Sequence, residues 1–274
     1  MERKRINLLF GQIFGFLIIQ IFGLLTGLRF FSLPIFRQRI FTPSLSVWDF
    51  FLAFIVAFLF ITAFLKFFKK KRIPFKLLFY FLIFSAGSIV FFIWINNSFI
   101  AFLLVISLFF LLHFFPTVIL QNILIAICVI GAGVVFGGSL FPYQMIIILL
   151  ILAVYDLIMV FGTGQMIKMF KEMLSQRLIL ALTIPETAKG LTTKISEVEA
   201  GKGFIFLGTG DLALPMAFAI SALRESLLSS IFIIIGSFLG LLILTLFFLE
   251  ERKPLPALPP IIAGGILGYL ISFL

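Results

Sequence analysis

The sequence predicts an all-α polytopic membrane protein with nine transmembrane helices. Of its 274 residues, 62% are hydrophobic and only 12% are charged, and the mean hydropathy of +1.28 is higher than a soluble globular domain sustains over its whole length. The apolar runs are about 20 residues long, as membrane helices require, whereas barrel strands would be short and alternating. The net charge of +10 indicates basic loops facing anionic lipid rather than nucleic-acid binding.

The nine spans are placed by counting apolar windows. They fall at approximately 7–28, 47–68, 75–95, 98–115, 117–137, 143–163, 203–223, 227–249 and 257–274. The first window has the basic start of a signal peptide, but its apolar run is too long and no cleavage pattern follows, so it is kept as a span. The fourth and fifth windows share a charge-free run that we expect to fold back at His113 to Pro116.

Basic residues are distributed unevenly between the two sides of this bundle. With the N-terminus inside, 17 of the 21 Lys and Arg residues face the cytoplasm, and the exterior receives only Arg29, Arg37, Arg39 and Arg224. Cytoplasmic loops of membrane proteins carry such an excess. We therefore predict a multi-pass protein of the cell membrane, with the N-terminus and residues 164–202 in the cytoplasm and the C-terminus outside.

One connection is much longer than the others. We expect residues 1–274 to form a single membrane-embedded domain, in which 1–163 holds spans one to six, 164–202 is a cytoplasmic loop, and 203–274 holds spans seven to nine. The spacing of apolar and charged residues after Gly164 predicts an amphipathic helix along the inner surface. The following "LILALTIP" is short and apolar and ends at Pro185, so either a strand or a further helical turn is possible.

Pairs of glycines recur four residues apart in several spans. The pairs are Gly11 and Gly15, Gly23 and Gly27, Gly133 and Gly137, Gly236 and Gly240, and Gly264 and Gly268. Small residues at this spacing let helices approach closely. We expect them to serve packing within one monomer rather than a dimer interface.

The residue inventory excludes several chemistries. The single cysteine, Cys128, permits no disulfide framework and no thiolate metal cluster. The single histidine, His113, excludes the paired histidines of zinc proteases. A Ser-His pair stays formally open, although we expect His113 to be an interfacial or packed residue. No metal or cofactor is expected.

Two acidic residues lie well inside predicted spans. Asp156 occurs in "ILAVYDLIMVFG" and Asp211 in "FIFLGTGDLALP". An ionisable group at such a position costs roughly 2.5–3.5 kcal/mol on insertion scales, so both are candidates for function. Asp49, which follows Trp48 at the start of the second span, is instead expected to cap its helix at the interface.

The two carboxylates are predicted to lie at the same depth. Asp156 precedes the inner end of its span by about 7 residues, or roughly 10 Å, and Asp211 follows the start of the next span by about 8 residues, or roughly 12 Å. Like charges in a poorly solvated site do not both ionise cheaply, so such a pair holds one shared proton. One acid then acts as general base on a water while the other donates a proton, as in aspartic proteases.

Glycines beside Asp211 favour a site that receives a peptide. Gly208 and Gly210 weaken the start of the helix and permit the close approach of another backbone. A substrate helix in lipid has every carbonyl hydrogen-bonded, so it has to unwind before hydrolysis. Pairing with an enzyme strand would replace the hydrogen bonds that are lost.

Three short motifs occur in spans six, seven and nine. They are Tyr155–Asp156, Gly208-Thr209-Gly210-Asp211 and Pro256-Ala257-Leu258-Pro259. In this order and at these depths they resemble the signatures of the presenilin and signal peptide peptidase family, the G-x-G-D intramembrane aspartyl proteases. The resemblance covers essentially the whole chain and is greatest to archaeal presenilin homologues.

The resemblance implies a presenilin-like bundle in which Asp156 and Asp211 are the catalytic pair. It implies that Pro256 to Pro259, including Ala257 and Leu258, helps to shape the site and receive substrate. Tyr155 is expected either to hydrogen-bond near the pair or simply to pack. Thr209 occupies the variable position of its motif, where it could influence specificity.

The resemblance also implies partners. Single-span transmembrane peptides or proteins are the expected substrates, within a lipid bilayer, with no nucleic acid and no obligatory accessory subunit; the oligomeric state is left open. The charge-derived orientation is similar to presenilin and opposite to signal peptide peptidase, which implies substrates whose N-terminus faces outward.

Two other classes of protein compete with a protease. A proton- or cation-coupled transporter or channel would use the same intramembrane acids as ligands, and it would show paired inverted repeats with matching broken helices. A scaffold with an inactive site is hard to reconcile with two retained acids. A single broken segment around the second acid, joined to the Pro256–Pro259 motif, favours hydrolysis.

Overall fold

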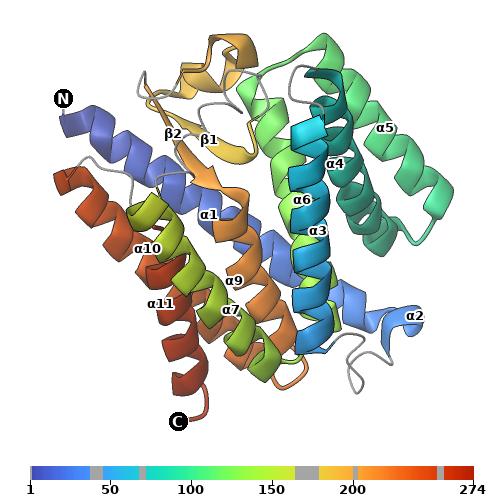
Figure 1. Cartoon of the computed structure of the whole chain (residues 1–274), viewed down its shortest axis with the longest axis vertical. Coiled ribbons are helices and arrows are strands. Elements are labelled where there is room, and N and C mark those ends of the chain that lie inside the picture. The colour runs from blue at the N-terminus through green and yellow to red at the C-terminus, as the bar shows by residue number, and fades with distance from the viewer. Residues whose placement is uncertain (1, 38–45, 68–71, 164–178, 200–202, 252–255) are drawn as a thin grey trace.

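The computed structural model describes residues 2–37, 46–67, 72–163, 179–199, 203–251 and 256–274 (Figure 1). Its principal elements are α1 (Glu2–Ser32), α2 (Pro34–Arg37), α3 (Val47–Phe67), α4 (Arg72–Ile95), α5 (Ser98–Phe114), α6 (Val118–Ser139), α7 (Pro142–Leu157), β1 (Ala181–Pro185), β2 (Phe204–Gly208), α9 (Thr209–Ala222), α10 (Leu227–Glu251) and α11 (Leu258–Ile271). A π-helical segment, Ile158–Thr163, continues α7, and two short 3₁₀ turns, Ala188–Thr192 and Ile195–Glu197, lie between the strands. The predicted amphipathic helix falls on residues outside this description.

Each predicted window contains a helix, so the helical membrane fold is confirmed in its coarse form. Over the described residues, the helices long and apolar enough to cross a membrane are Asn7–Ser32, Val118–Ser139, Pro142–Gly162 and Leu227–Phe247. Shorter apolar helices cover Tyr80–Ile95, Ser98–Phe114, Thr209–Ala222 and Leu258–Ile271. A total of nine crossings therefore stays a prediction.

The chain reverses where the sequence predicted a fold-back. Helix α5 ends at Phe114 and α6 begins at Val118, because Pro116 has no N–H to continue a helix. His113 is exposed in the last turn of α5. At the other end of α5, the Asn97 side chain accepts hydrogen bonds from the backbone N–H groups of Phe99 and Ile100, as an N-cap does.

Asp49 caps its helix, as predicted. The Asp49 carboxylate accepts hydrogen bonds from Ser46 N at 2.9 Å and from Ser46 Oγ at 2.8 Å. In return, Asp49 N donates to Ser46 Oγ at 3.1 Å. This reciprocal arrangement satisfies N–H groups that have no partner within the helix.

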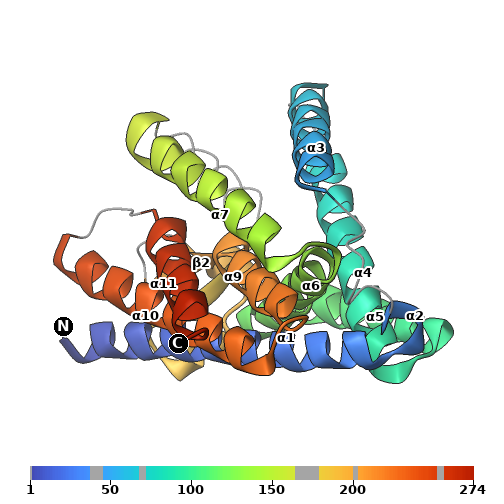
Figure 2. The ribbon, with the colours of Figure 1, turned by 90° about the horizontal axis from the view of Figure 1, so that it is seen from below.

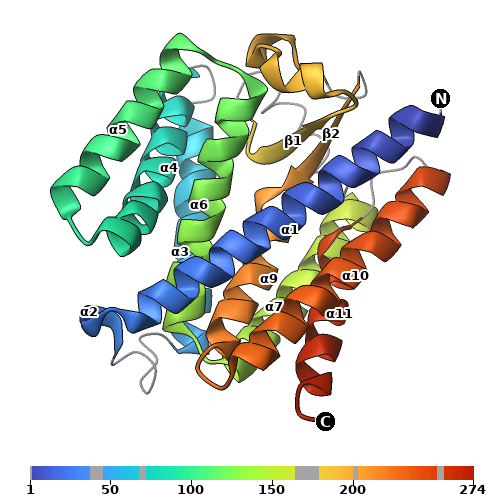
Figure 3. The same ribbon diagram turned by 180° about the vertical axis from the view of Figure 1, so that it is seen from behind.

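Helix α1 crosses the back of the molecule and contacts α6, α9 and α10 (Figure 3). Glycines make this contact close: a Cβ at Gly15 would lie 2.9 Å from the Leu182 side chain of β1, and a Cβ at Gly23 would overlap Met216 of α9. The helices α10 and α11 approach more closely still, because Gly236 and Gly264 meet backbone to backbone. The prediction that these small residues pack within one monomer is confirmed.

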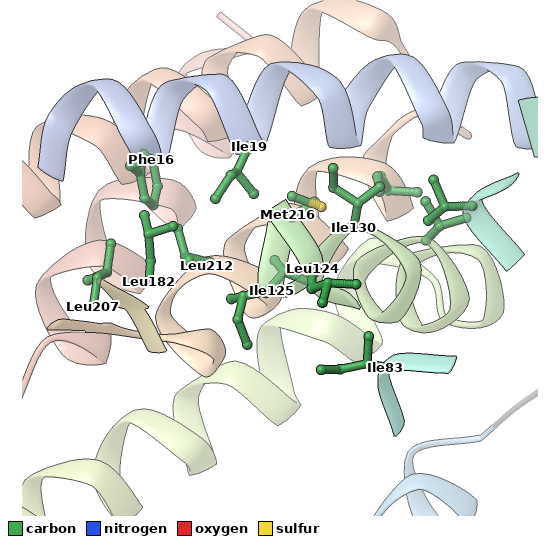
Figure 4. Close-up of a cluster of buried hydrophobic side chains, with 14 of the residues drawn as sticks. Phe16, Ile19, Ile83, Leu124, Ile125, Ile130, Leu182, Leu207, Leu212 and Met216 are labelled. Carbon is green, nitrogen blue, oxygen red and sulfur yellow. The ribbon is translucent and has the colours of Figure 1, made fainter. Parts of the chain in front are cut away.

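The core beside α1 is built from several elements. Phe16 and Ile19 of α1 point toward Leu182 of β1 and Leu212 of α9 (Figure 4). All four side chains are buried. Since β1 and α9 pack on the same face of α1, this cluster fixes the strand and the helix relative to each other.

Arg224 caps the C-terminal end of α6. The Arg224 guanidinium donates hydrogen bonds to the carbonyls of Gly137, Gly138 and Leu140 at 2.6, 2.6 and 2.8 Å. It also lies over the rings of Phe31 and Phe141, at 5.0 and 5.4 Å from their centroids. Carbonyls at a helix C-terminus have no donors within the helix, and the helix dipole favours a cation there.

Strands β1 and β2 form a two-stranded antiparallel sheet, which the all-α expectation did not include. Their register pairs Ala181 with Gly208 and Pro185 with Phe204. Of the two conformations left open for "LILALTIP", the strand is correct. The expectation of a helix throughout 203–223 is wrong at its start, because β2 occupies Phe204–Gly208.

Helix α6 engages the side of β1 that faces away from β2. The Asn122 side chain donates to Thr183 O at 2.7 Å and accepts from Thr183 N at 2.9 Å. One turn of α6 therefore supplies the pair of hydrogen bonds that a neighbouring strand would supply. Gln121 adds a hydrogen bond from Nε2 to Ile179 O at 2.6 Å, just before β1 begins.

Candidate active site

Asp156 lies in the last turn of α7, one residue before that helix ends. The chain then continues as the π-helical segment Ile158–Thr163. Such wide turns are rare and often occur at functional sites. Seen from below, α7 and α3 rise from the same side of the bundle, with α9 and α6 beneath them (Figure 2).

The Asp156 carboxylate is held by the segment that opens α11. Leu258 N donates a hydrogen bond to Asp156 Oδ2 at 3.2 Å. Pro256 and Ala257 precede α11, while Leu258 and Pro259 form its first positions. A helix start exposes N–H groups without intrahelical partners, so this motif can present a donor to the acid.

Asp211 lies in the first turn of α9, immediately after β2. The backbone N–H of Gly208, the N-cap residue, lies near enough to the Asp211 carboxylate to interact with it favourably. A Cβ at Gly208 would lie 2.9 Å from Asp211 Oδ2, closer than unbonded atoms normally come. Glycine at this position therefore lets the carboxylate fold back onto the backbone.

The two acids are brought together. Asp156 and Asp211 are near enough for their carboxylates to interact electrostatically, and both side chains are partly buried. The predicted depth of Asp211 is wrong in one detail: β2 rises about 3.3 Å per residue rather than the 1.5 Å of a helix. Asp156 is held by the start of α11, and Asp211 directly follows β2, so equal helical depth alone does not account for their proximity.

The remaining predicted site residues differ in their surroundings. Tyr155 is 42% exposed, and among the described residues no hydrogen bond of its side chain is found. Its role near the pair therefore stays a prediction. Thr209, the first residue of α9, is partly buried. Gly210 is exposed, and a Cβ there would meet no atom within 4 Å. It therefore borders open space beside Asp211.

Three amide side chains near the site were missed by the sequence reasoning. Gln20 donates from Nε2 to the carbonyl of Leu212 at 2.9 Å, next to Asp211, and Asn122 and Gln121 hold β1. The available signal was a polar amide inside an apolar window. That signal names no partner, since the partners lie 58 to 192 residues away in sequence.

No group of three or more His, Cys, Asp or Glu side chains that could hold a metal ion occurs within the part of the chain that the structure describes. The donor set at the site consists of two carboxylates and backbone N–H groups. The carboxylates can exchange protons with a water, which is acid–base chemistry, and the backbone N–H groups can only donate hydrogen bonds.

Comparison with known proteins agrees with this geometry. A family model described as signal-peptide peptidase, presenilin aspartyl protease matches residues 13–274. Two solved structures of a presenilin family intramembrane aspartate protease, in space groups C222 and P2, have similar folds. The first has a TM-score of 0.68 at 21% identity, covering 97% of this chain and 98% of that one. The second has a TM-score of 0.66 at 20% identity, covering 96% of each chain.

No curated protein matches the sequence. The likeness to the two solved structures concerns the fold, whereas the family model spans almost the whole chain, including both acids and the Pro256–Pro259 motif. The chain belongs to the signal peptide peptidase and presenilin family of aspartyl proteases.

Proposed function

We propose that Asp156 and Asp211 are the catalytic pair of an intramembrane aspartyl protease that uses a water to cleave single-span transmembrane substrates. The observation that carries this proposal is that the carboxylates supplied by α7 and α9 lie near enough to interact electrostatically. The surroundings of the two acids differ: Asp156 accepts a hydrogen bond from Leu258 N, whereas Asp211 lies beside the backbone of Gly208. Two acids in different settings suit two different roles.

The pair shares one proton in the reactive state. The ionised acid removes a proton from water as the water oxygen attacks the peptide carbonyl carbon, and the protonated acid gives its proton to the carbonyl oxygen. The tetrahedral gem-diol then collapses: one of its hydroxyl groups returns a proton to the acid that is now ionised, and the departing amine takes the proton from the acid that received it from water. The C–N bond breaks and both acids return to their initial state.

The hairpin supports a way to hold an unwound substrate. The outward side of β1 is occupied by Asn122, while β2 leads directly into Asp211. An extended substrate segment would therefore add beside β2 rather than beside β1, replacing hydrogen bonds lost when its helix unwinds. Gly210 and the Pro256–Pro259 segment would border the peptide near the acids.

The distribution of basic residues supports one orientation of the chain in the membrane. We place the N-terminus and residues 164–202 in the cytoplasm and the C-terminus outside, because 17 of 21 basic residues then face inward. Substrates then have an outward N-terminus. The resemblance to archaeal presenilin homologues, and not the charge, is the basis for proposing that the chain works without accessory subunits. The transporter or channel alternative is not favoured, since the family is one of proteases.

The test uses the full-length chain purified in detergent with a synthetic single-span peptide. Mass spectrometry of the fragments should show cuts inside the membrane segment, and Asp156→Asn and Asp211→Asn should each abolish them. Cleavage that survives either substitution would remove the proposed mechanism. A proton or cation flux in vesicles that depends on the same acids, without cleavage, would point to the transporter instead.

A further inference from the structure

Gln20 connects α1 to the backbone beside Asp211. It is fully buried, and its Nε2 donates a hydrogen bond to Leu212 O at 2.9 Å. Because a carbonyl oxygen only accepts, the nitrogen of the carboxamide has to face Leu212. The link joins residues 192 positions apart in sequence, so it ties the first helix of the chain to the turn that carries Asp211.

That turn of α9 is weak on its own. Its N-cap is Gly208, which supplies no side-chain cap, and Gly210 adds backbone freedom within the first turn. Pro215 lies inside the helix and has no N–H, so the carbonyl of Asp211, four residues earlier, lacks its usual helical donor. The segment around Asp211 therefore depends on contacts from outside the helix.

Retaining a carboxamide at position 20 has a cost. Within the described part of the chain, the buried Oε1 of Gln20 has no hydrogen-bond partner, and burying an unpaired polar atom is unfavourable. A leucine of similar size would avoid that cost. The glutamine is therefore better suited to directing a donor at Leu212 than to stabilising the fold.

The surroundings of Gln20 make it a rigid support. Neighbouring Phe16 and Ile19 are buried on the same face of α1 (Figure 4), and Gly23 packs tightly on Met216 of α9. Close packing leaves little room for the amide or for the facing turn of α9 to shift. The position of the Gln20 Nε2 donor is therefore fixed by packing in the core.

We propose that Gln20 is a positioning residue that holds the first turn of α9, and with it the Asp211 carboxylate, in register with Asp156. This inference rests on the proposed catalytic role of Asp211. Gln20 touches neither substrate nor the reacting atoms. It acts through the Leu212 carbonyl, so its loss should change the rate of the chemical step and not the binding of the peptide.

The test compares Gln20→Leu with Gln12→Leu in the full-length protein. Gln12 is a second buried glutamine, two turns earlier on α1, and so controls for the loss of an amide from this helix. We expect Gln20→Leu to lower kcat by about tenfold or more, with KM and thermal stability unchanged. Gln12→Leu should leave kcat unchanged.

The Gln20→Glu variant provides a second test, which does not depend on whether the leucine variant folds. A protonated glutamic acid keeps an O–H donor for Leu212 O, whereas the ionised form has none. Activity of Gln20→Glu should therefore approach that of the unmodified protein at acidic pH and fall away as pH rises, relative to the unmodified protein at each pH. An unchanged relative profile would overturn the proposal.

Three results separate the possible failures. If Gln20→Leu keeps its kcat while Asp211→Asn is inactive, the positioning role is wrong and the catalytic pair stands. If kcat and thermal stability fall together, as for a general packing defect, the positioning role is also wrong. If Asp211→Asn itself remains active, the proposed function fails, whatever the Gln20 variants do.

Discussion

Leu258 N lies 3.2 Å from Asp156 Oδ2, so the start of α11 holds an acid from α7 that is 102 positions earlier in sequence. This hydrogen bond gives the Pro256–Pro259 motif a direct role at the site. The same acid is near enough to Asp211 for the two carboxylates to interact electrostatically. The Asp156 carboxylate of α7 thereby interacts with residues of both α9 and α11.

Substitutions at Asp156 should separate anchoring from catalysis. Asp156→Asn keeps an oxygen that accepts from Leu258 N, so it should be inactive but retain its free energy of unfolding to within about 0.5 kcal/mol. Asp156→Ala should be inactive and less stable by about 1–2 kcal/mol, because Leu258 N loses its partner. Unfolding in mixed micelles measures the difference. Equal stability of the two variants would contradict the anchoring role.

Replacing Gly208 with alanine should affect the protein differently from replacing Gly210 with alanine. Gly208→Ala places a Cβ 2.9 Å from Asp211 Oδ2, so the carboxylate should shift and the cleavage rate fall by about 10- to 100-fold. Gly210→Ala adds a Cβ in open space and should leave the thermal stability unchanged. Initial rates and melting curves test the pair, and full activity of Gly208→Ala would refute the steric argument.

Asn122 should protect the Thr183 backbone of β1 from exchange with solvent. Asn122→Leu leaves Thr183 N and Thr183 O without the partners at 2.9 and 2.7 Å, which we expect to destabilise the protein by about 2–4 kcal/mol. Hydrogen exchange at the Thr183 amide should accelerate. Gln121→Leu is the matched control, since Gln121 bonds Ile179 O and the Thr183 amide should stay protected.

Arg224 should stabilise the end of α6. Arg224→Lys keeps the charge but not the fork that reaches three carbonyls, so it should lower the free energy of unfolding by about 1–2 kcal/mol, and Arg224→Met by about 2–4 kcal/mol. Chemical unfolding gives both values. The exposed Arg29 provides a comparison, and Arg29→Met should change stability little.

The rate of cleavage should depend on pH on both sides of an optimum. A catalytic pair needs one proton between its two members, so activity is lost when the pair takes up a second proton and when it gives up the first. Initial rates across a pH series, with stability checked at each pH, measure this. A flat profile would argue against a shared proton.

The helices were predictable because their signal is local. Apolar windows and Pro116 place the helices and the reversal between α5 and α6 from neighbouring residues alone. Likewise, Asp49 and Ser46 form a cap within a single turn. The acids of the site were predictable for a related reason, since a carboxylate inside an apolar run is costly wherever the chain goes.

The hairpin and the supporting amides were not predictable to the same degree. The segment that forms β2 is short and apolar, and nothing in it distinguishes a strand from a helix until β1 lies beside it. The roles of Gln20 and Asn122 depend on backbone groups of residues 61 to 192 positions away. Sequence patterns mark such amides as unusual but do not show what they hold.

The bidentate contact between Asn122 and Thr183 also bears on inhibitor design. Because Asn122 of α6 already bonds the outer side of β1, the proposed pairing of substrate beside β2 leaves a single flank of the hairpin for an extended peptidomimetic. Its amide groups should be arranged along one edge only, with the opposite edge capped or methylated. Methylation of each amide nitrogen of such a compound in turn would then show which of its edges forms hydrogen bonds with the protein.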